Sequence, residues 1–279
     1  CIRDRAIVAP LAEELAKASV FILVATGARK LELTSLTDHI FYAGICALGF
    51  AFVENLGYFA LSSSAGEFVV MALVRTGFGV FGHPLYTTAT AVGIWAWRTK
   101  GGLWKAAVGY IAACLLHGLW NGGPTLLAGS LGLDDTGQLA AMILVYIVLF
   151  VPVFIGTIIM TTRNRRNEYE AVRSQLPLMV EAGLVTPAEA DMIADPRKRR
   201  AILADSGKYG RVAKRNQKRT ITAATEAALA QHRIAAGEGG PELIKRRDQL
   251  SEWLRSRPDK LGQLPLMPQF PPIQPPATW

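Results

Sequence analysis

Ionisable and amide side chains stand inside long apolar stretches of this chain, where they could carry out acid–base chemistry. Each of four successive apolar stretches contains at least one such group. The residues are Glu13, Glu14, Glu54, His83, His117 and Asn121. A charged side chain at the centre of a bilayer costs roughly 2.5–3.5 kcal/mol, so groups retained there usually serve chemistry or transport. Acids, histidines and an amide together form a set suited to hydrolysis inside a membrane.

The first motif is EELAK, which begins at Glu13. On a helix, Glu13 and Lys17 are one turn apart and are predicted to pair, while Glu14 projects about 100° away from Glu13. A nearby lysine can keep one carboxylate ionised while the other carries a proton, which suits a base that passes the proton onward. Alternatively, the motif is a charged first turn at the membrane surface, since it follows Pro10.

Three further motifs place single polar groups in apolar surroundings. FAFVE ends at Glu54, FGHPLY contains His83 followed by Pro84, and HGLWN runs from His117 to Asn121. We expect Pro84 to kink its helix, because proline removes a backbone hydrogen bond. His117 and Asn121 are four residues apart and therefore share one helix face. Either histidine alone would more often be a packing residue, but chance placement of the whole set is much less plausible.

Charge divides the chain into a neutral part and a basic part. Residues 1–162 hold nine basic and nine acidic residues, whereas residues 163–279 hold 21 basic and 13 acidic residues, so the net charge of +8 belongs to the second part. We predict a transmembrane domain over 1–162 and a basic helical region over 163–260. Six prolines between Pro265 and Pro276 predict a disordered Pro-rich tail over 261–279.

The predicted fold is all-α: a polytopic transmembrane helix bundle with a helical and partly disordered soluble tail. About 20 helical residues cross the roughly 30 Å of hydrocarbon in a bilayer. About five stretches of the first domain are long enough. They run near 6–28, 39–61, 70–97, 103–128 and 138–161. The chain begins at Cys1 instead of Met and has no signal-peptide pattern, so we expect one or more further spans upstream.

Basic residues in short loops predict the orientation of these spans. Arginines at 163–166 place the tail in the cytoplasm, and the bases at 98–105 and 29–30 then lie on the same side. The loops at 62–67 and 134–135 lack bases and fall outside, whereas Arg3 and Arg5 run against the rule. With this orientation, and with the third span entering the membrane near Arg75, all six polar residues lie in a slab roughly 6 Å thick, about 10–16 Å below the outer face.

The soluble region contains basic runs at Arg197–Arg200 and Lys208–Arg219. Such runs behind a membrane span can bind anionic lipid headgroups, at about 1 kcal/mol per charge. Nucleic acid is the competing partner, but we do not expect it, because no aromatic residues alternate with the bases. Prolines predict short helices over 164–182 and 186–204, broken at Pro177, Pro187 and Pro196, and a helix follows over 241–257.

The ordered motifs resemble those of PrsW-type intramembrane proteases, glutamic or metallo-type enzymes within the CAAX-protease and bacteriocin-processing superfamily. The series is EExxK, FxxxE, His83 followed ten residues later by Gly93, and HxxxN, and it covers roughly residues 8–125. Each motif is weak alone, but their order is fairly specific. One departure is Asn121, which stands where PrsW proteins often have Asp. The tail after residue 163 resembles no family.

The resemblance implies that Glu13 and Glu14 supply the carboxylate that activates water, while Glu54 and His83 complete the site. It implies an intramembrane endopeptidase that cuts a membrane-anchored protein, such as an anti-sigma factor, on its outer side. A bacterial inner (plasma) membrane is the implied location, with several spans and a cytoplasmic tail.

By the same resemblance, His117 and Asn121 would hold the developing oxyanion or a shared ligand. Whether a metal takes part stays open in the sequence. Glu54, His83 and His117 could bind a single zinc ion with water in an open position. Without metal, the same groups could form a glutamate-activated water and an oxyanion hole, and we favour this arrangement.

Two other functions compete with proteolysis. An ion- or proton-coupled transporter would also keep Glu and His within the membrane, but the chain lacks an inverted repeat or paired broken helices. A non-catalytic membrane adaptor, with the basic tail as its working part, would not explain why six polar groups share one depth.

Overall fold

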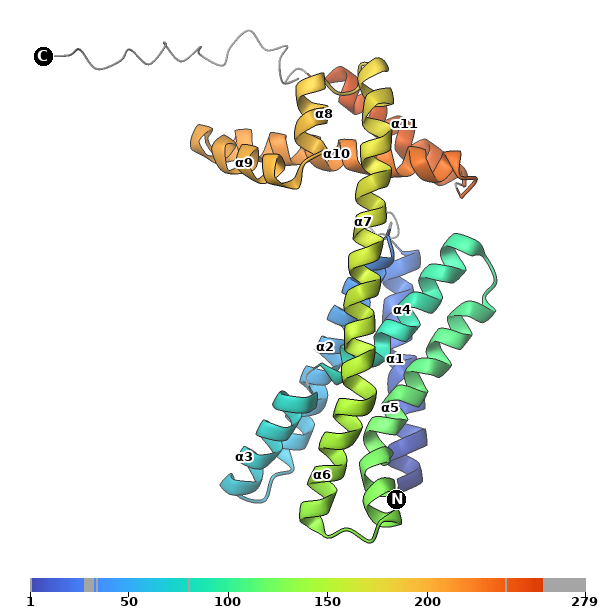
Figure 1. Ribbon diagram of the computed structural model, residues 1–279, viewed down its shortest axis with the longest axis vertical. Helices are drawn as coiled ribbons and strands as arrows, with labels where there is room; N and C mark the ends of the chain where they lie inside the picture. Colours follow the sequence, from blue (N-terminus) through green and yellow to red (C-terminus); the bar gives the residue numbers. More distant parts are fainter. Residues whose placement is uncertain (1, 28–32, 34, 80, 239, 258–279) are drawn as a thin grey trace, which may run out of the picture. The chain divides into compact units, whose positions relative to one another are not determined.

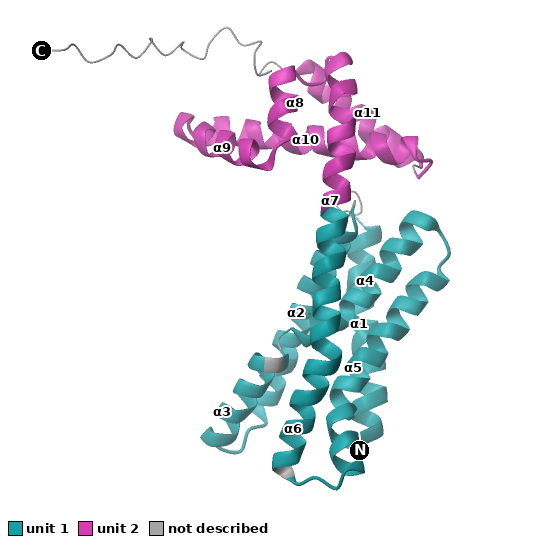
Figure 2. Cartoon of the chain, in the orientation of Figure 1, with its two compact units in different colours: residues 1–165 teal, residues 166–279 magenta. Residues whose placement is uncertain are grey.

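A computed structural model describes residues 2–27, 33, 35–79, 81–238 and 240–257, and every regular element in these ranges is helical. The chain divides into two compact units, Cys1–Arg165 and Arg166–Trp279 (Figures 1 and 2). The predicted Pro-rich tail over 261–279 and the loop with Arg29 and Lys30 lie outside the described residues.

Unit 1 is a bundle of long helices (Figure 1). Short π-helical turns interrupt several of them. Its elements are η1 (Asp4–Val8), α1 (Ala9–Thr26), α2 (Leu36–Ala60), α3 (Ala65–Val74), η2 (Arg75–Gly79), α4 (Gly82–Lys100), α5 (Trp104–Ser130), α6 (Asp135–Val145), η3 (Tyr146–Phe150) and the first half of α7 (Val151–Glu181). Side-chain caps begin several of them. Ser35, for example, forms a capping box with Asp38 at the start of α2.

Helix α4 is the centre of unit 1. It packs most extensively against α5 and next most against α2, and it also contacts α1. About half of its residues are buried, including His83 and Tyr86 near its beginning and Gly93 and Ile94 further along. The outer surfaces of the surrounding helices instead expose large apolar side chains, among them Phe52 and Leu115. An apolar outside around a partly polar inside is what a lipid environment requires.

Among the described residues, three helical stretches are long and apolar enough to cross a membrane. They are Leu36–Ala60, Ala65–Lys100 and Thr136–Glu181, and they coincide with the second, third and fifth spans predicted from the sequence. The first and fourth predicted spans are also helical, as α1 and α5. These two helices carry the acidic pair with Lys17 and the His117–Asn121 motif, and those polar groups lower their apolar character.

Pro84 has a different role from the one predicted. α4 begins at Gly82, so Pro84 lies in its first turn and not within a longer helix. Backbone N–H groups in a first turn have no helical partner, so proline costs little there. Because α4 begins after the π-helical turn η2, His83 lies in the first turn of α4. There its ring lies near that of Phe50 on α2.

Unit 2 contains the second half of α7 and four further helices with a core of their own. These are α8 (Pro187–Ile193), α9 (Pro196–Ser206), α10 (Arg211–Ala235) and α11 (Pro241–Ser256), with the short 3-10 turn η4 (Gly207–Tyr209) between α9 and α10. Leu176, Met192, Ala224 and Leu254 are among the buried residues of its core.

Prolines begin three of these helices, as predicted at Pro187 and Pro196 and as found again at Pro241. The predicted break at Pro177 is wrong, because α7 runs through this residue to Glu181. Leu176 and Met179 on either side of Pro177 are both buried in the core. Their burial offsets the roughly 3 kcal/mol that an interior proline costs.

Candidate active site

Glu14 on α1 lies at the centre of the polar cluster. Its side chain is fully buried and accepts hydrogen bonds on both oxygens. Lys17 Nζ donates to Oε1 at 2.6 Å, His117 Nδ1 contacts the same oxygen at 3.0 Å, and Thr87 Oγ1 donates to Oε2 at 3.1 Å. Because its partners come from α1, α4 and α5, this carboxylate ties three helices together.

Lys17 connects the acidic pair to His83. We expected Lys17 to pair with Glu13, but its ammonium lies 3.9 Å from Glu13 Oε2 and much closer to Glu14. It donates to His83 Nδ1 at 2.7 Å and lies 4.5 Å from the centre of the Phe50 ring. Two of its three N–H groups therefore bind Glu14 and His83, while the other contacts that the ammonium makes with described residues are the longer ones to Glu13 and Phe50.

His83 joins this cluster to Glu54 on α2. Its Nε2 lies 2.9 Å from Glu54 Oε2. Since Nδ1 accepts from the Lys17 ammonium, Nε2 must carry the hydrogen and donate to Glu54. Glu14 on α1 and Glu54 on α2 are thus linked by hydrogen bonds through Lys17 and His83.

Arg75 is a member of the cluster that the sequence analysis did not assign to it. Its guanidinium donates to Glu54 Oε2 at 2.7 Å and also to the side-chain oxygen of Asn55. It stacks on the ring of Tyr58 at 3.8 Å. A lone arginine in an apolar stretch was the available signal, because such a base needs an acidic partner inside a membrane.

His117 on α5 has one nitrogen engaged and one facing the remaining acid. With Nδ1 directed at Glu14, its Nε2 lies 3.7 Å from Glu13 Oε2. The ring of Tyr86 stacks on the imidazole, with centroids 4.7 Å apart and planes inclined by 21°. Tyr86 and Thr87 were also missed, although they lie three and four residues after His83 and so share its helix face.

Glu13 differs from every other acid in the cluster. In the described part of the chain, its Oε2 is a buried oxygen without a hydrogen-bond partner. Ligand atoms of Glu13, His83 and His117 all lie within 4.8 Å of one another. A carboxylate oxygen and two imidazoles at this spacing surround a position that a water molecule or a metal ion could occupy.

Glycines fix the distance between the helices that carry the two histidines. A Cβ on Gly93 of α4 would lie 2.5 Å from the carbonyl oxygen of Lys105 and 2.9 Å from Gly109 Cα. A Cβ on Gly109 would be equally close to α4. The Gly93 motif therefore allows α4 and α5 to touch along their backbones, and this contact holds His83 near His117.

The structure brings together five of the six residues singled out from the sequence: Glu13, Glu14, Glu54, His83 and His117. Asn121 is directed elsewhere, because its amide donates to the backbone carbonyl of Arg5 at 3.0 Å. Nearby, Gly118 and Gly122 pack against Ala6, so this face of α5 holds the η1 segment.

A comparison with protein families agrees with this geometry. Residues 3–157, more than half of the chain, match the model of the PrsW family, described as intramembrane metalloproteases. The chain belongs to the PrsW family. This PrsW protein is therefore a membrane protein and a peptidase, as the motif series predicted. No curated protein and no solved structure matches it. The matched range contains all the polar residues described above.

Proposed function

We propose that this PrsW protease is an endopeptidase that cuts a membrane-anchored protein, with Glu13 as the base that activates water. The observation that carries the proposal is the buried Glu13 Oε2, which has no hydrogen-bond partner among the described residues and faces His117 Nε2. A water beside both atoms would donate one hydrogen to each. Such a water is oriented and ready to lose a proton.

The reaction then follows from the partners of each group. Glu13 takes a proton from the water as its oxygen attacks the carbonyl carbon of the peptide bond. The third N–H of Lys17, whose contacts with Glu13 and Phe50 are long, would stabilise the resulting oxyanion. When the carbon–nitrogen bond breaks, protonated Glu13 returns its proton to the leaving amine, which restores the starting state.

The remaining residues position these groups. Glu14 fixes Lys17 and orients His117 so that Nε2 faces Glu13. Glu54, itself held by Arg75, orients His83. For Asn121 we propose a positioning role in place of the oxyanion contact expected from the resemblance, since its amide is directed at Arg5.

The name of the family implies a metal ion, and the donor set fits one. Among the described residues, Glu13 Oε2 has no hydrogen-bond partner, and it lies 3.7 Å from His117 Nε2. His117 Nδ1 is held by Glu14, which makes a carboxylate–histidine pair typical of metal sites. His83 would be the third ligand once one of its ring nitrogens exchanged its present partner, Lys17 or Glu54. When bound, such an ion would polarise the water and the peptide carbonyl. Glu54, which the sequence analysis gave as a metal ligand, would instead orient His83 by a hydrogen bond without binding the ion itself.

We further propose that α1 and α5 cross the bilayer with the three candidate spans, which gives five spans in this chain. Both helices supply groups to the buried cluster, so they must lie at the same depth as α2 and α4. The positive-inside rule then places residues 163–279 in the cytoplasm and cleavage near the outer face of a bacterial inner membrane. A substrate of the anti-sigma-factor kind, with one span and an outer domain, fits this depth.

Comparison of protein N-termini between strains tests the proposal directly. The host strain would express the full-length protein as wild type or as Glu13→Gln, with Glu181→Gln as the matched control. Glu181 is exposed and lies in unit 2, so its loss should leave the site untouched. New N-termini in membrane and secreted fractions are then measured by mass spectrometry.

We expect a fragment that appears with wild type and with Glu181→Gln but not with Glu13→Gln, cut near the outer end of a single-pass protein. Identical N-termini in all three strains at equal expression would overturn the proposal. They would favour an ion- or proton-coupled transporter that uses the same Glu and His residues. Parallel growth with a membrane-permeant chelator distinguishes a bound metal from glutamate acting alone.

A further inference from the structure

The region between α9 and the first half of α10 concentrates positive charge. Residues 197–219 contain ten basic side chains and one acid, Asp205. Most of the basic side chains are exposed, including those of Lys214, Arg215 and Lys218. Lys208 pairs with Asp205, and Lys198 pairs with Asp191 outside this stretch, which leaves a large excess of positive charge on the surface.

These residues form a helical hairpin that adds two partly buried apolar side chains, Ile202 and Leu203, to the core of unit 2. α9 and η4 contain no buried residue, and burial on α10 begins only at Thr220. Figure 1 shows α9 lying alongside the first half of α10, and the two helices contact each other. We call residues 196–219 the basic hairpin. The apolar side chains Ile202 and Leu203 attach this hairpin to the core, whereas most of its basic side chains are exposed and available for binding.

The turn of the basic hairpin exposes apolar side chains among the bases. Tyr209 is 46% exposed and Val212 is 72% exposed. Gly210 between them has a φ of 99°, a conformation that favours glycine and lets η4 turn directly into α10. A tyrosine and a valine surrounded by lysine and arginine match the chemistry of a membrane interface, where aromatic rings lie at headgroup depth and bases meet lipid phosphates.

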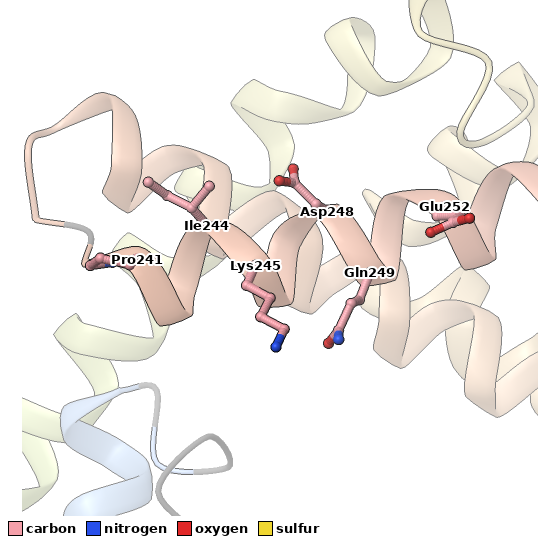
Figure 3. A pocket seen from close by; sticks show the side chains of 6 residues that line it. All are labelled: Pro241, Ile244, Lys245, Asp248, Gln249 and Glu252. Atoms are coloured by element: carbon pink, nitrogen blue, oxygen red, sulfur yellow. The ribbon is translucent and has the colours of Figure 1, made fainter.

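Another exposed surface of the same unit has a different character. The outer face of α11 forms a shallow hollow lined by Pro241, Ile244, Lys245, Asp248, Gln249 and Glu252 (Figure 3). Here a single lysine stands among two acids and an amide. Unit 2 therefore does not carry positive charge evenly, and the basic hairpin is a distinct surface.

We propose that the basic hairpin binds anionic lipid headgroups of the membrane that the protein spans, with Tyr209 and Val212 in the interface. The chain itself supplies the argument for lipid. Unit 2 begins at Arg166, directly after the apolar part of the third candidate span, so a bilayer is always within reach. Tethering replaces a bimolecular encounter by a local one, which favours lipid over any partner in solution. This interaction is separate from the proposed proteolysis.

The test uses the full chain in lipid nanodiscs, which expose both membrane faces. Val212→Cys carries an environment-sensitive fluorophore, and the three native cysteines are replaced by alanine. The discs contain phosphatidylcholine with phosphatidylglycerol added in steps. Lys214→Gln, Arg215→Gln and Lys218→Gln together remove three charges from the basic hairpin. Arg173→Gln, Lys245→Gln and Arg255→Gln together remove three exposed charges elsewhere in unit 2 and serve as the matched control.

We expect a blue shift that grows with phosphatidylglycerol and falls with salt. The hairpin variant should lower the ratio of bound to free hairpin by about fivefold per charge, or about 100-fold in total, and the control should not. Equal emission in neutral and anionic discs would overturn the proposal, as would an equal loss in the control. A larger shift with duplex DNA in neutral discs would assign the surface to nucleic acid instead. Proteolysis by the same variants is measured separately, so either proposal can fail alone.

Discussion

Both units of the molecule contain a buried cluster of charged side chains. The two clusters differ in whether every carboxylate is held by hydrogen bonds. In unit 2, Glu189 accepts hydrogen bonds from Arg257 and from the backbone N–H of Thr186. Arg257 also donates to Thr220 and to the carbonyl of Leu254. In unit 1, Glu14 is satisfied in the same way, yet Glu13 beside it retains an oxygen without a hydrogen-bond partner among the described residues.

The difference indicates what each cluster is for. A buried ion pair with every group satisfied fixes the packing of the segments that carry it, here α8, α10 and the end of α11. A buried acid left without a partner costs free energy in the folded state, so it is typically retained for a ligand or a reaction. Unit 1 combines both kinds, since Glu14 holds the helices together and Glu13 keeps a buried oxygen without a hydrogen-bond partner among the described residues.

Glu13→Gln should give the largest effect on activity. The amide cannot accept the proton of water, so we expect cleavage to fall by about 10²–10⁴-fold, the usual contribution of a general base. The unfolding temperature in nanodiscs should stay the same or rise slightly, because no hydrogen bond to Oε2 from a described residue is lost and the contacts with Lys17 and His117 are long, at 3.9 and 3.7 Å. Cleavage is followed by the substrate fragment, and stability by the unfolding temperature.

Glu14→Gln is the matched variant at the neighbouring position. It should lose activity too, but it should also destabilise unit 1, because Lys17 would then be a buried cation with less compensation. If Glu13→Gln and Glu14→Gln change the stability of unit 1 equally, the distinction between a carboxylate held by hydrogen bonds and one without them is wrong.

In unit 2 the expected effect is on stability alone. Glu189→Gln leaves the Arg257 guanidinium buried without a full counter-charge, which should cost about 3–5 kcal/mol of folding free energy. Replacing both residues, Glu189→Leu with Arg257→Met, should restore most of that stability, since apolar side chains of similar size often substitute for a buried pair. Cleavage by the double variant should match wild type. Protease resistance of unit 2 in the full chain measures the first effect, and loss of cleavage in a stable double variant would contradict the second.

The sequence predicted which residues come together in the site better than it predicted the hydrogen bonds between them. Charged groups in apolar helices have few low-energy arrangements, so Glu13, Glu14, Glu54, His83 and His117 could be expected to face one another. The sequence did not determine which of these groups would bind each other. Residues three and four apart on a helix are both within reach, so spacing alone could not decide which glutamate Lys17 would bind.

The contacts that escaped prediction depend on tertiary structure. Pro84 is compatible with a kink or with a first turn, and only the position of η2 decides between them. Glu189 and Arg257 lie 68 positions apart in polar sequence, where nothing distinguishes them from exposed charges. Pro177 shows the reverse case, because burial on both sides of it overrides the local tendency of proline to end a helix.

Gly93→Ala tests whether close helix contact sets the distance between the two histidines. The new methyl group would overlap the backbone of α5, so we expect a loss of about 1–3 kcal/mol in stability. A displacement of about 1 Å between His83 and His117 should lower cleavage by about 100-fold. Gly49→Ala on α2 is the control, because its Cβ would meet nothing within 4 Å. Equal cleavage by both variants would show that the site tolerates separation of α4 and α5.

Arg75→Gln should have the smallest effect and bears most directly on the comparison between the units. Each unit has an arginine–glutamate pair, but Glu54 is also bound by His83 at 2.9 Å, so it keeps a partner when Arg75 is removed. We therefore expect cleavage to fall by only about tenfold, consistent with a loss of about 1.4 kcal/mol in positioning. Arg75→Lys should recover less than half of that loss, because lysine cannot donate to Glu54 and Asn55 together while stacking on Tyr58. Abolition of cleavage by Arg75→Gln in a stably folded protein would instead place Arg75 in contact with the substrate, and no change at all would mean that His83 alone orients Glu54.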